Sequence, residues 1–315
     1  MLVSIVVPVY NEAQVLPIFI ESLSEAIKNW PEKTEVIFVD DGSTDETKKI
    51  IKSYIDKIHF NFKIRLVSLY RNYGQAIALA AGLDSAKGDI ILTIDGDMEF
   101  DPNILTAFKE KIIEGFDMAS GVRISKETSM LRKACSFFIN LLGRYITGLR
   151  LKDLSCPVNG FSRSLVETIR GGQELSFLKI RVARFAKKIA EIEIAQRSRP
   201  KGRSKYDFIR LFSLFIEFII SYLRNVFQYI MVFGLFTILL SFLSGLLYLF
   251  LRIIGLIPPS AILQVIVFLA FFTGWQSVIL GFLGEYLLRI RSLLSERPVY
   301  KIREVIDSEE WNFYS

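Results

Sequence analysis

The stretch that decides the fold is Ile90-Ile91-Leu92-Thr93-Ile94-Asp95-Gly96-Asp97-Met98-Glu99-Phe100-Asp101-Pro102. Its first five residues are mostly apolar and predict a short buried strand of a parallel sheet. Asp95 and Asp97 follow where this strand ends, and in open α/β sheets ligands bind beyond the carboxyl ends of the strands. Their spacing places both side chains on one side of an extended backbone. Such paired oxygens suit Mg²⁺ or Mn²⁺ bridging a diphosphate, and a solvated acidic turn explains the same motif equally well.

Strand and helix patterns alternate along the first two thirds of the chain. Apolar runs predict further strands at residues 3–9, 35–39, 64–69 and 118–122. Ser43 followed by Glu46 is a capping-box pattern that predicts a helix start at Ser43, and Asp101 before Pro102 predicts another. This alternation predicts an α/β fold with a mostly parallel sheet and helices on both faces.

Polar residues follow three of the predicted strands, as Tyr10-Asn11-Glu12, Asp40-Asp41 and the Asp95/Asp97 pair. Because parallel strands end at one edge of a sheet, we expect these loops to converge on one cleft. Acidic turns that arise by chance would not recur at successive strand ends. The first strand is not followed by G-x-G-x-x-G, and no P-loop motif occurs, which disfavours a dehydrogenase or a P-loop ATPase.

Four motifs occur in order: Val6-Val7-Pro8-Val9-Tyr10-Asn11-Glu12, Val39-Asp40-Asp41-Gly42-Ser43-Thr44-Asp45, Arg71-Asn72-Tyr73-Gly74-Gln75 and Asp95-Gly96-Asp97. Together they resemble the motifs of family 2 glycosyltransferases, which have the Rossmann-like GT-A fold. Within that family the chain is most similar to polyprenyl-phosphate glycosyltransferases. These include dolichyl-phosphate mannose synthase and bacterial enzymes that load glucose or an aminoarabinose derivative onto undecaprenyl phosphate.

The resemblance extends over nearly the whole chain and implies an inverting, metal-dependent enzyme. It would transfer a sugar from a nucleoside diphosphate donor, with UDP favoured, to a polyprenyl phosphate, using Mg²⁺ or Mn²⁺. On the nucleotide side, Asp41 would accept a hydrogen bond from the base. The residues that would line the base and ribose pocket are Pro8, Tyr10, Glu12 and Asp95.

The metal ligands implied by the resemblance follow the central strand. Asp95 would face the ribose or the metal, and Asp97 would ligate the metal. Glu99 falls where dolichyl-phosphate mannose synthases often have Gln as a further ligand, and a carboxylate is at least as good a ligand for a hard cation.

Positions in the middle of the chain would bind the acceptor phosphate, by the same resemblance. Arg123, Arg132 and Ser136 match family positions that hold it, and Arg grips phosphate oxygens at two points. The basic loop at residues 197–206 resembles the family's R-x-x-G-x-S-K-Y loop. We expect Arg199, Ser204 and Lys205 to clamp the diphosphate and the lipid phosphate, and a juxtamembrane patch that meets anionic lipid is the alternative interpretation.

Asp153 is the predicted catalytic carboxylate, because relatives carry an Asp at the start of this motif, facing the reacting centre. It need not be a strong base, since a phosphate monoester is already ionised at neutral pH. The following run, Cys156-Pro157-Val158-Asn159-Gly160, departs from the Cys-Met-Leu-Arg-Ala type of close bacterial relatives. The identity of the sugar therefore cannot be carried over.

Two uncharged stretches, residues 231–251 and 262–282, are each long enough to cross the hydrocarbon core of about 30 Å. Basic residues crowd before the first and after the second, whereas the connecting loop has only Arg252. The positive-inside rule then places the catalytic domain and both termini in the cytosol, at the inner or plasma membrane. The predicted domains are a GT-A domain at 1–206, an interfacial amphipathic helix at 207–224, a transmembrane hairpin at 225–290 and a cytosolic tail at 291–315.

Composition restricts the alternatives. The single histidine, His59, excludes a His-rich zinc site, and the net charge of +6 comes without a nucleic-acid reading motif, so no nucleic-acid partner is expected. A processive polysaccharide synthase of the same fold is one alternative, although no Q-x-x-R-W motif surrounds any tryptophan. A non-catalytic membrane scaffold is another. Relatives also suggest self-association through the membrane part.

Overall fold

The computed structural model has two compact units, which are described separately. One comprises Met1–Phe218 and Pro298–Ser315, and the other comprises Ile219–Arg297. The structure describes residues 1–55, 62–124, 151–154, 156–169, 178–196, 226–294 and 300–308.

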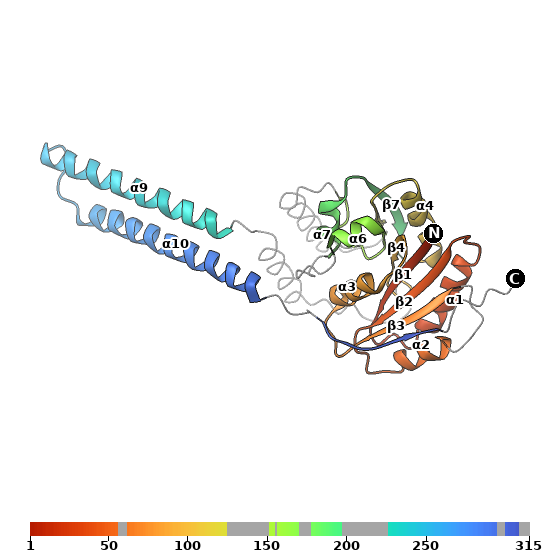
Figure 1. Cartoon of the computed structure of the whole chain (residues 1–315). Helices are drawn as coiled ribbons and strands as arrows, with labels where there is room; N and C mark the ends of the chain where they lie inside the picture. The colour runs from red at the N-terminus through yellow and green to blue at the C-terminus, as the bar shows by residue number, and fades with distance from the viewer. Residues whose placement is uncertain are drawn as a thin grey trace. The chain divides into compact units, whose positions relative to one another are not determined.

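The first unit is built on a twisted sheet (Figure 1), with eight strands in the described residues, in the order β7-β5-β6-β4-β1-β2-β3-β8. The strands are β1 Leu2–Val9, β2 Lys33–Asp40, β3 Lys63–Leu69, β4 Ile90–Thr93, β5 Met118–Ile124, β6 Asn159–Ser162, β7 Ile189–Ala195 and β8 Ile302–Asp307. The helices are α1 Leu16–Ile27, α2 Thr47–Ile55, α3 Gln75–Ser85, the 3₁₀ turn η1 Pro102–Ile104, α4 Leu105–Ile113, α6 Arg163–Ile169 and α7 Leu178–Phe185. The parallel run β4-β1-β2-β3 confirms the predicted α/β fold, and β6 and β8 are antiparallel to their neighbours.

Helices cover both faces of the central strands, which explains why these strands read as nearly continuous apolar runs. Helices α1, α2 and α4 pack on one face, around a core that includes Ile5, Phe19, Phe38 and Phe108. Helix α3 lies on the opposite face (Figure 1), close enough that a Cβ on Gly82 would come within 2.2 Å of Val6 Cγ1. The Ala-rich sequence of α3 permits this close approach.

The strand ends meet as predicted. Val9, the last residue of β1, pairs with Asp40, the last residue of β2, and Asp41 N donates to Val9 O at 3.0 Å. On the other side of β1, Thr93 pairs with Val6, and Ile94 N donates to Val6 O at 3.2 Å. The carboxyl ends of β1, β2 and β4 therefore share one edge of the sheet.

The C-terminal region differs from the predicted tail at 291–315. Helix α10 continues to Leu294, and β8 is an edge strand of the sheet, antiparallel to β3. The six-residue strand is short and its partner is remote, so neither hydrophobic period nor a neighbouring turn marks it in the sequence. Sequence analysis also missed β6 and β7.

The predicted helix start at Ser43 was wrong. Helix α2 begins at Thr47, whose N–H donates to Asp45 Oδ1 at 3.0 Å, so Asp45 takes the capping role. Ser43 Oγ instead accepts from Asn11 N at 3.0 Å, because β1 brings that backbone beside it. Asp101 does cap as expected, accepting from Asn103 N at 3.0 Å.

The second unit contains two long apolar helices, α9 Val226–Ile253 and α10 Ala261–Leu294. Their stretches Phe227–Ile253 and Ala261–Leu288 are long and apolar enough to cross a membrane, and only 11% of each window is buried within the protein. They pack closely at glycines, since a Cβ on Gly234 would lie 2.7 Å from Gly274 O. The predicted spans fall inside these helices. The predicted amphipathic helix at 207–224 lies outside the described residues.

Candidate active site

The residues predicted to line the nucleotide pocket lie where β1 ends. Pro8 is half-buried, Tyr10 is 39% exposed, and Glu12 is half-buried. Glu12 N donates to Thr47 Oγ1 at 2.9 Å, which ties this loop to the start of α2. The structure therefore leaves the Tyr10 ring accessible at the edge where the strand ends converge.

Asp41 is buried at the end of β2, with 3% of its surface exposed. Its two oxygens accept from Tyr73 N at 2.7 Å and Gly74 N at 2.8 Å. Burial raises the pKa of Asp41, and the two backbone N–H groups oppose part of that shift. Asp41 thus anchors residues 70–75, called the 70–75 loop below. A carboxylate has further lone pairs, so its predicted contact with a nucleotide base stays a prediction.

Gly42 allows the 70–75 loop to pass close to the end of β2. Its φ is +70°, and a Cβ there would lie 2.5 Å from the carbonyl carbon of Arg71 and 2.8 Å from Asn72 N. Both the backbone conformation and the space therefore require glycine.

Asp95 is half-buried just beyond β4, and the same loop contacts it. Gln75 Nε2 lies 2.7 Å from each oxygen of Asp95. Since Gln75 is the first residue of α3, the loop and the helix start connect Asp41 with Asp95. The sequence analysis quoted Gln75 within a motif but gave it no role.

Asp97 and Glu99 follow Asp95 in the loop after β4. Asp97, 8% exposed, accepts from Glu99 N at 3.0 Å, and Glu99 Oε2 accepts from Gln196 Nε2 at 2.8 Å. Within the described ranges, no three Asp, Glu, His or Cys side chains meet closely enough to hold a metal. The carboxylate oxygens still fit a hard ion that takes its remaining ligands from a diphosphate and water. The ligand assignments of Asp95, Asp97 and Glu99 stay predictions.

Two residues that the sequence assigned to different roles form an ion pair. Arg123 Nε donates to Asp153 Oδ2 at 2.8 Å, and Arg123 Nη2 donates to Asp153 Oδ1 at 3.1 Å. Asp153 is 7% exposed. Burial alone would lower the pKa of Arg123, but the hydrogen bond to Asp153 and the charge of Asp153 together outweigh burial, so the net shift is upward. The structure therefore brings the predicted acceptor-binding cation and the predicted catalytic carboxylate together.

Lys179, in α7, is a residue that the sequence analysis missed. Its ammonium donates to Asp153 O at 2.7 Å and to Gly121 O and Cys156 O at 3.4 Å each. Burial lowers the pKa of Lys179 to about 8, and the Cys156 and Asp153 charges oppose that shift. Gly121 lies in β5, and the other two carbonyls belong to Asp153 and Cys156, so Lys179 fixes the backbone that carries Asp153. A lysine in an ordinary amphipathic pattern gives no signal of this role.

The remaining predicted site residues, Arg132, Ser136, Arg199, Ser204 and Lys205, lie outside the described residues.

Solved structures resemble this fold. A crystal structure of glucosyl-3-phosphoglycerate synthase from Mycobacterium tuberculosis, in complex with Mn²⁺ and UDP-glucose, aligns with a TM-score of 0.51 at 20% identity. The alignment covers 70% of this chain and 77% of that one. Another structure of that enzyme, with Mg²⁺ and UDP, gives a TM-score of 0.50 at 19% identity, over 69% and 78% of the two chains. These similarities confirm the GT-A fold.

Similarity in sequence is more extensive. An undecaprenyl-phosphate 4-deoxy-4-formamido-L-arabinose transferase from Photorhabdus laumondii is 31% identical over 98% of this chain and 96% of its own length. The enzyme of the same name from Yersinia enterocolitica is 33% identical over 98% and 94%. The family model for glycosyl transferase family 2 matches residues 4–170, more than half of the sequence. With the GT-A sheet and its converging strand ends, this match shows that the chain is a glycosyltransferase and belongs to glycosyl transferase family 2.

Proposed function

We propose that this enzyme transfers a sugar from a nucleoside diphosphate sugar, with UDP favoured, to a polyprenyl phosphate at the cytosolic face of the membrane. The observation that carries the proposal is a pairing of two features in one chain. Asp41 follows the carboxyl end of β2, Asp95 and Asp97 follow that of β4 at the same edge of a GT-A sheet, and the same chain contains two helices that are apolar enough to span a bilayer. A soluble nucleotide-sugar donor needs the site at the sheet edge, and a lipid acceptor needs an enzyme held at the bilayer.

The relatives support a polyprenyl phosphate acceptor, since they are named as undecaprenyl-phosphate transferases and match 98% of this chain. We infer that undecaprenyl or dolichyl phosphate is the acceptor. The sugar is left open, because the run from Cys156 to Gly160 departs from the pattern expected from the family resemblance. In this chain Asn159 Nδ2 donates to Cys156 O at 3.1 Å, which closes a turn in this run.

On the donor side, Asp97 and Asp95 would hold Mg²⁺ or Mn²⁺, with Glu99 as a further ligand if it leaves Gln196. The ion would supply positive charge against the departing diphosphate. Asp41 and Tyr10 would bind the base, and the Gln75 amide would keep the Asp95 carboxylate oriented.

On the acceptor side, an oxygen of the lipid phosphate would attack the anomeric carbon as the bond to the donor diphosphate breaks. The products are the polyprenyl-phosphate sugar, inverted at that carbon, and the nucleoside diphosphate. The acceptor needs no proton removed at neutral pH, and Arg123 holds both oxygens of Asp153. Asp153 would therefore orient Arg123 and meet positive charge that develops on the sugar. Arg132, Ser136, Arg199, Ser204 and Lys205 are proposed to complete this side.

The chain path supports the proposed topology. Residues before and after the apolar helices belong to one folded unit, so the chain must cross the membrane an even number of times. Together with the positive-inside rule, this supports a cytosolic catalytic domain and cytosolic termini. Self-association through the helices is a further proposal that the relatives suggest.

The test is a transfer assay on membranes that contain the full chain. Undecaprenyl phosphate and a panel of labelled nucleotide sugars are added with Mn²⁺, and labelled lipid is extracted. We expect labelled lipid from one donor, and its loss in the Asp97→Asn variant or with EDTA. A complete absence of labelled lipid across the panel would refute the proposal.

A further inference from the structure

A segment near the end of the chain, residues 300–308, contacts the loop that holds the donor-side carboxylates. Strand β8 pairs with β3, and the pairing continues past the end of β3, where Tyr70 N donates to Lys301 O at 2.9 Å. Tyr70 is the first residue of the 70–75 loop. The 300–308 segment, which follows the apolar helices in sequence, therefore reaches the loop directly.

The pairing contains a bulge next to this contact. Ser68 pairs with Glu304 and Leu69 with Ile302, which leaves Arg303 as an extra residue in β8. Bulges bend a strand, re-aim the neighbouring side chains and are frequent beside active sites. Beyond this bulge, Tyr300 and Lys301 contact the segment that follows β3.

Both of these side chains make specific contacts. The Lys301 ammonium lies 5.3 Å from the centroid of the Tyr70 ring. The Tyr300 hydroxyl donates to Asp84 Oδ2 at 2.7 Å. Burial and the Asp84 carboxylate raise the pKa of Tyr300, so it remains a donor. Asp84 lies in the last turn of α3, the helix that starts at Gln75.

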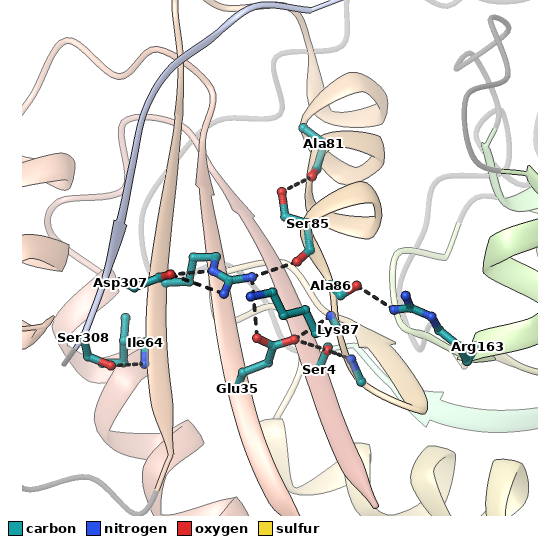
Figure 2. A network of polar contacts seen from close by, with 12 residues as sticks. Ser4, Glu35, Ile64, Ala81, Ser85, Ala86, Lys87, Arg163, Asp307 and Ser308 are labelled. Carbon is teal, nitrogen blue, oxygen red and sulfur yellow. Dashed lines mark hydrogen bonds and ion pairs between the residues drawn. The ribbon is translucent and has the colours of Figure 1, made fainter. Parts of the chain in front are cut away.

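A second path connects β8 to the end of α3 (Figure 2). Arg65 Nε donates to Asp307 Oδ1 at 2.5 Å, and Arg65 Nη1 donates to Ser85 O at 2.8 Å. Figure 2 shows Asp307 on one side of this guanidinium and Ser85 on the other. Glu35 Oε2 lies 3.6 Å from the same Nη1, in surroundings where the Arg65 side chain is 10% exposed. Asp307 therefore helps to orient the arginine that holds the C-terminal end of α3.

We propose that the 300–308 segment is a positioning element of the donor site. The segment fixes the start of the 70–75 loop at Tyr70 and the C-terminal end of α3 at Asp84 and Ser85. The residues between these points then hold their backbone N–H groups against Asp41 and the Gln75 amide against Asp95. This inference depends on the proposed function only in taking the ligand of the site to be a nucleoside diphosphate. Tyr300 and Asp307 are positioning residues, because they act through the loop and α3.

The experiment uses the full chain in detergent, with Tyr300→Phe alone and Tyr300→Phe combined with Asp307→Ala. Hydrogen–deuterium exchange reads the amides of the 70–75 loop, and titration calorimetry reads the Kd of UDP with Mn²⁺. The double variant loses the Tyr300 bond to Asp84 and both Arg65 bonds to Asp307, which predicts about tenfold faster exchange in the loop and about a tenfold higher Kd. The single variant should show a smaller change in the same direction.

Glu110→Gln is the control, because Glu110 is exposed on α4, outside both the 300–308 segment and the 70–75 loop, and should leave both values as in the wild type. A role in donor positioning raises the apparent KM for the donor and leaves that for the acceptor unchanged, whereas a general loss of folded protein lowers kcat alone.

Wild-type exchange rates in the loop of the double variant would overturn the inference. If wild-type protein binds no UDP, the proposed uridine donor fails, and the exchange rates still decide the positioning role.

Discussion

Arg123 and Asp153 form a two-point ion pair, with N–O distances of 2.8 Å and 3.1 Å, on a carboxylate that is 7% exposed. A fork of two parallel hydrogen bonds fixes orientation as well as charge. Arg123, the predicted phosphate-binding residue, and Asp153, the predicted catalytic carboxylate, therefore hold each other in place. We expect a substitution of either residue to change turnover through its effect on the other.

Asp153→Asn should lower kcat by about 10²-fold, since one charge-assisted hydrogen bond of the pair is lost and the group loses its charge. The Kd for UDP with Mn²⁺ should not change, because Asp41 and Asp95 are untouched. Steady-state kinetics and calorimetry measure the two values. Loss of nucleotide binding together with turnover would point to a structural role for Asp153.

Arg123→Lys tests the same pair from the other side. Lysine keeps the charge but cannot make the fork, so we expect a similar fall in kcat. The kcat of the double variant Arg123→Lys with Asp153→Asn should be only slightly lower than that of either single variant, because both substitutions disrupt the same ion pair. Fully additive losses would contradict a joint role.

Asp41→Asn should weaken nucleotide binding. The amide offers one oxygen where two backbone N–H groups, of Tyr73 and Gly74, now donate, so one N–H loses its acceptor. The expected cost is about 1–3 kcal/mol, or about 5- to 150-fold in Kd. Asp101→Asn is the matched control, because Asn caps a helix as well as Asp does. Equal effects of the two variants on Kd would exclude a specific role for Asp41.

Gly42→Ala should displace the 70–75 loop. The new Cβ would meet the Arg71 backbone at 2.5 Å, in addition to the strain of a φ of +70°. Gly115→Ala separates the two effects, because Gly115 has a φ of +92° and no atom within 4 Å of its added Cβ. Both variants should lose about 1–2 kcal/mol of stability from backbone strain. Only Gly42→Ala should also raise the Kd for UDP, and calorimetry compares the two.

Lys179 predicts a pH dependence of stability. Its folded pKa of about 8 lies below the usual lysine pKa of 10.5, so between these values the unfolded chain binds more protons. The free energy of unfolding therefore rises with pH in this window. From pH 7.5 to 9.5 the gain from this group is about 2 kcal/mol. Thermal unfolding should show that the stability of the wild type rises more than that of Lys179→Met between pH 7.5 and 9.5. An equal pH dependence of stability in the two proteins would contradict the prediction.

The sequence predicted the part of the fold that local pattern controls. The strands from β1 to β5 are apolar runs with polar ends, and because they are parallel their ends had to meet, which placed Tyr10, Asp41 and Asp95 correctly at one edge. Strand β8 was missed because six residues carry no distinctive period. The strand it pairs with is also far away in sequence: Asp307 of β8 and its partner Arg65 of β3 are 242 residues apart.

In the candidate site, too, local patterns were predictable from the sequence and contacts between distant segments were not. Carboxylates at strand ends form a recognisable pattern, which singled out Asp41, Asp95 and Asp97 as candidates. The pairing of Arg123 with Asp153 could not be predicted, since it depends on how β5 and residues 151–154 approach each other in space. Ser43 misled for a related reason: its hydroxyl had a tertiary partner, Asn11 N, that outcompeted the local cap.

The position of β8 has a consequence for the order of events during synthesis. The ribosome makes β3 early and β8 after both apolar helices, so the edge of β3 stays unpaired while those helices are being translated. An unpaired edge strand is a template for aggregation. The sheet of the catalytic domain can therefore be completed only after both apolar helices have been translated.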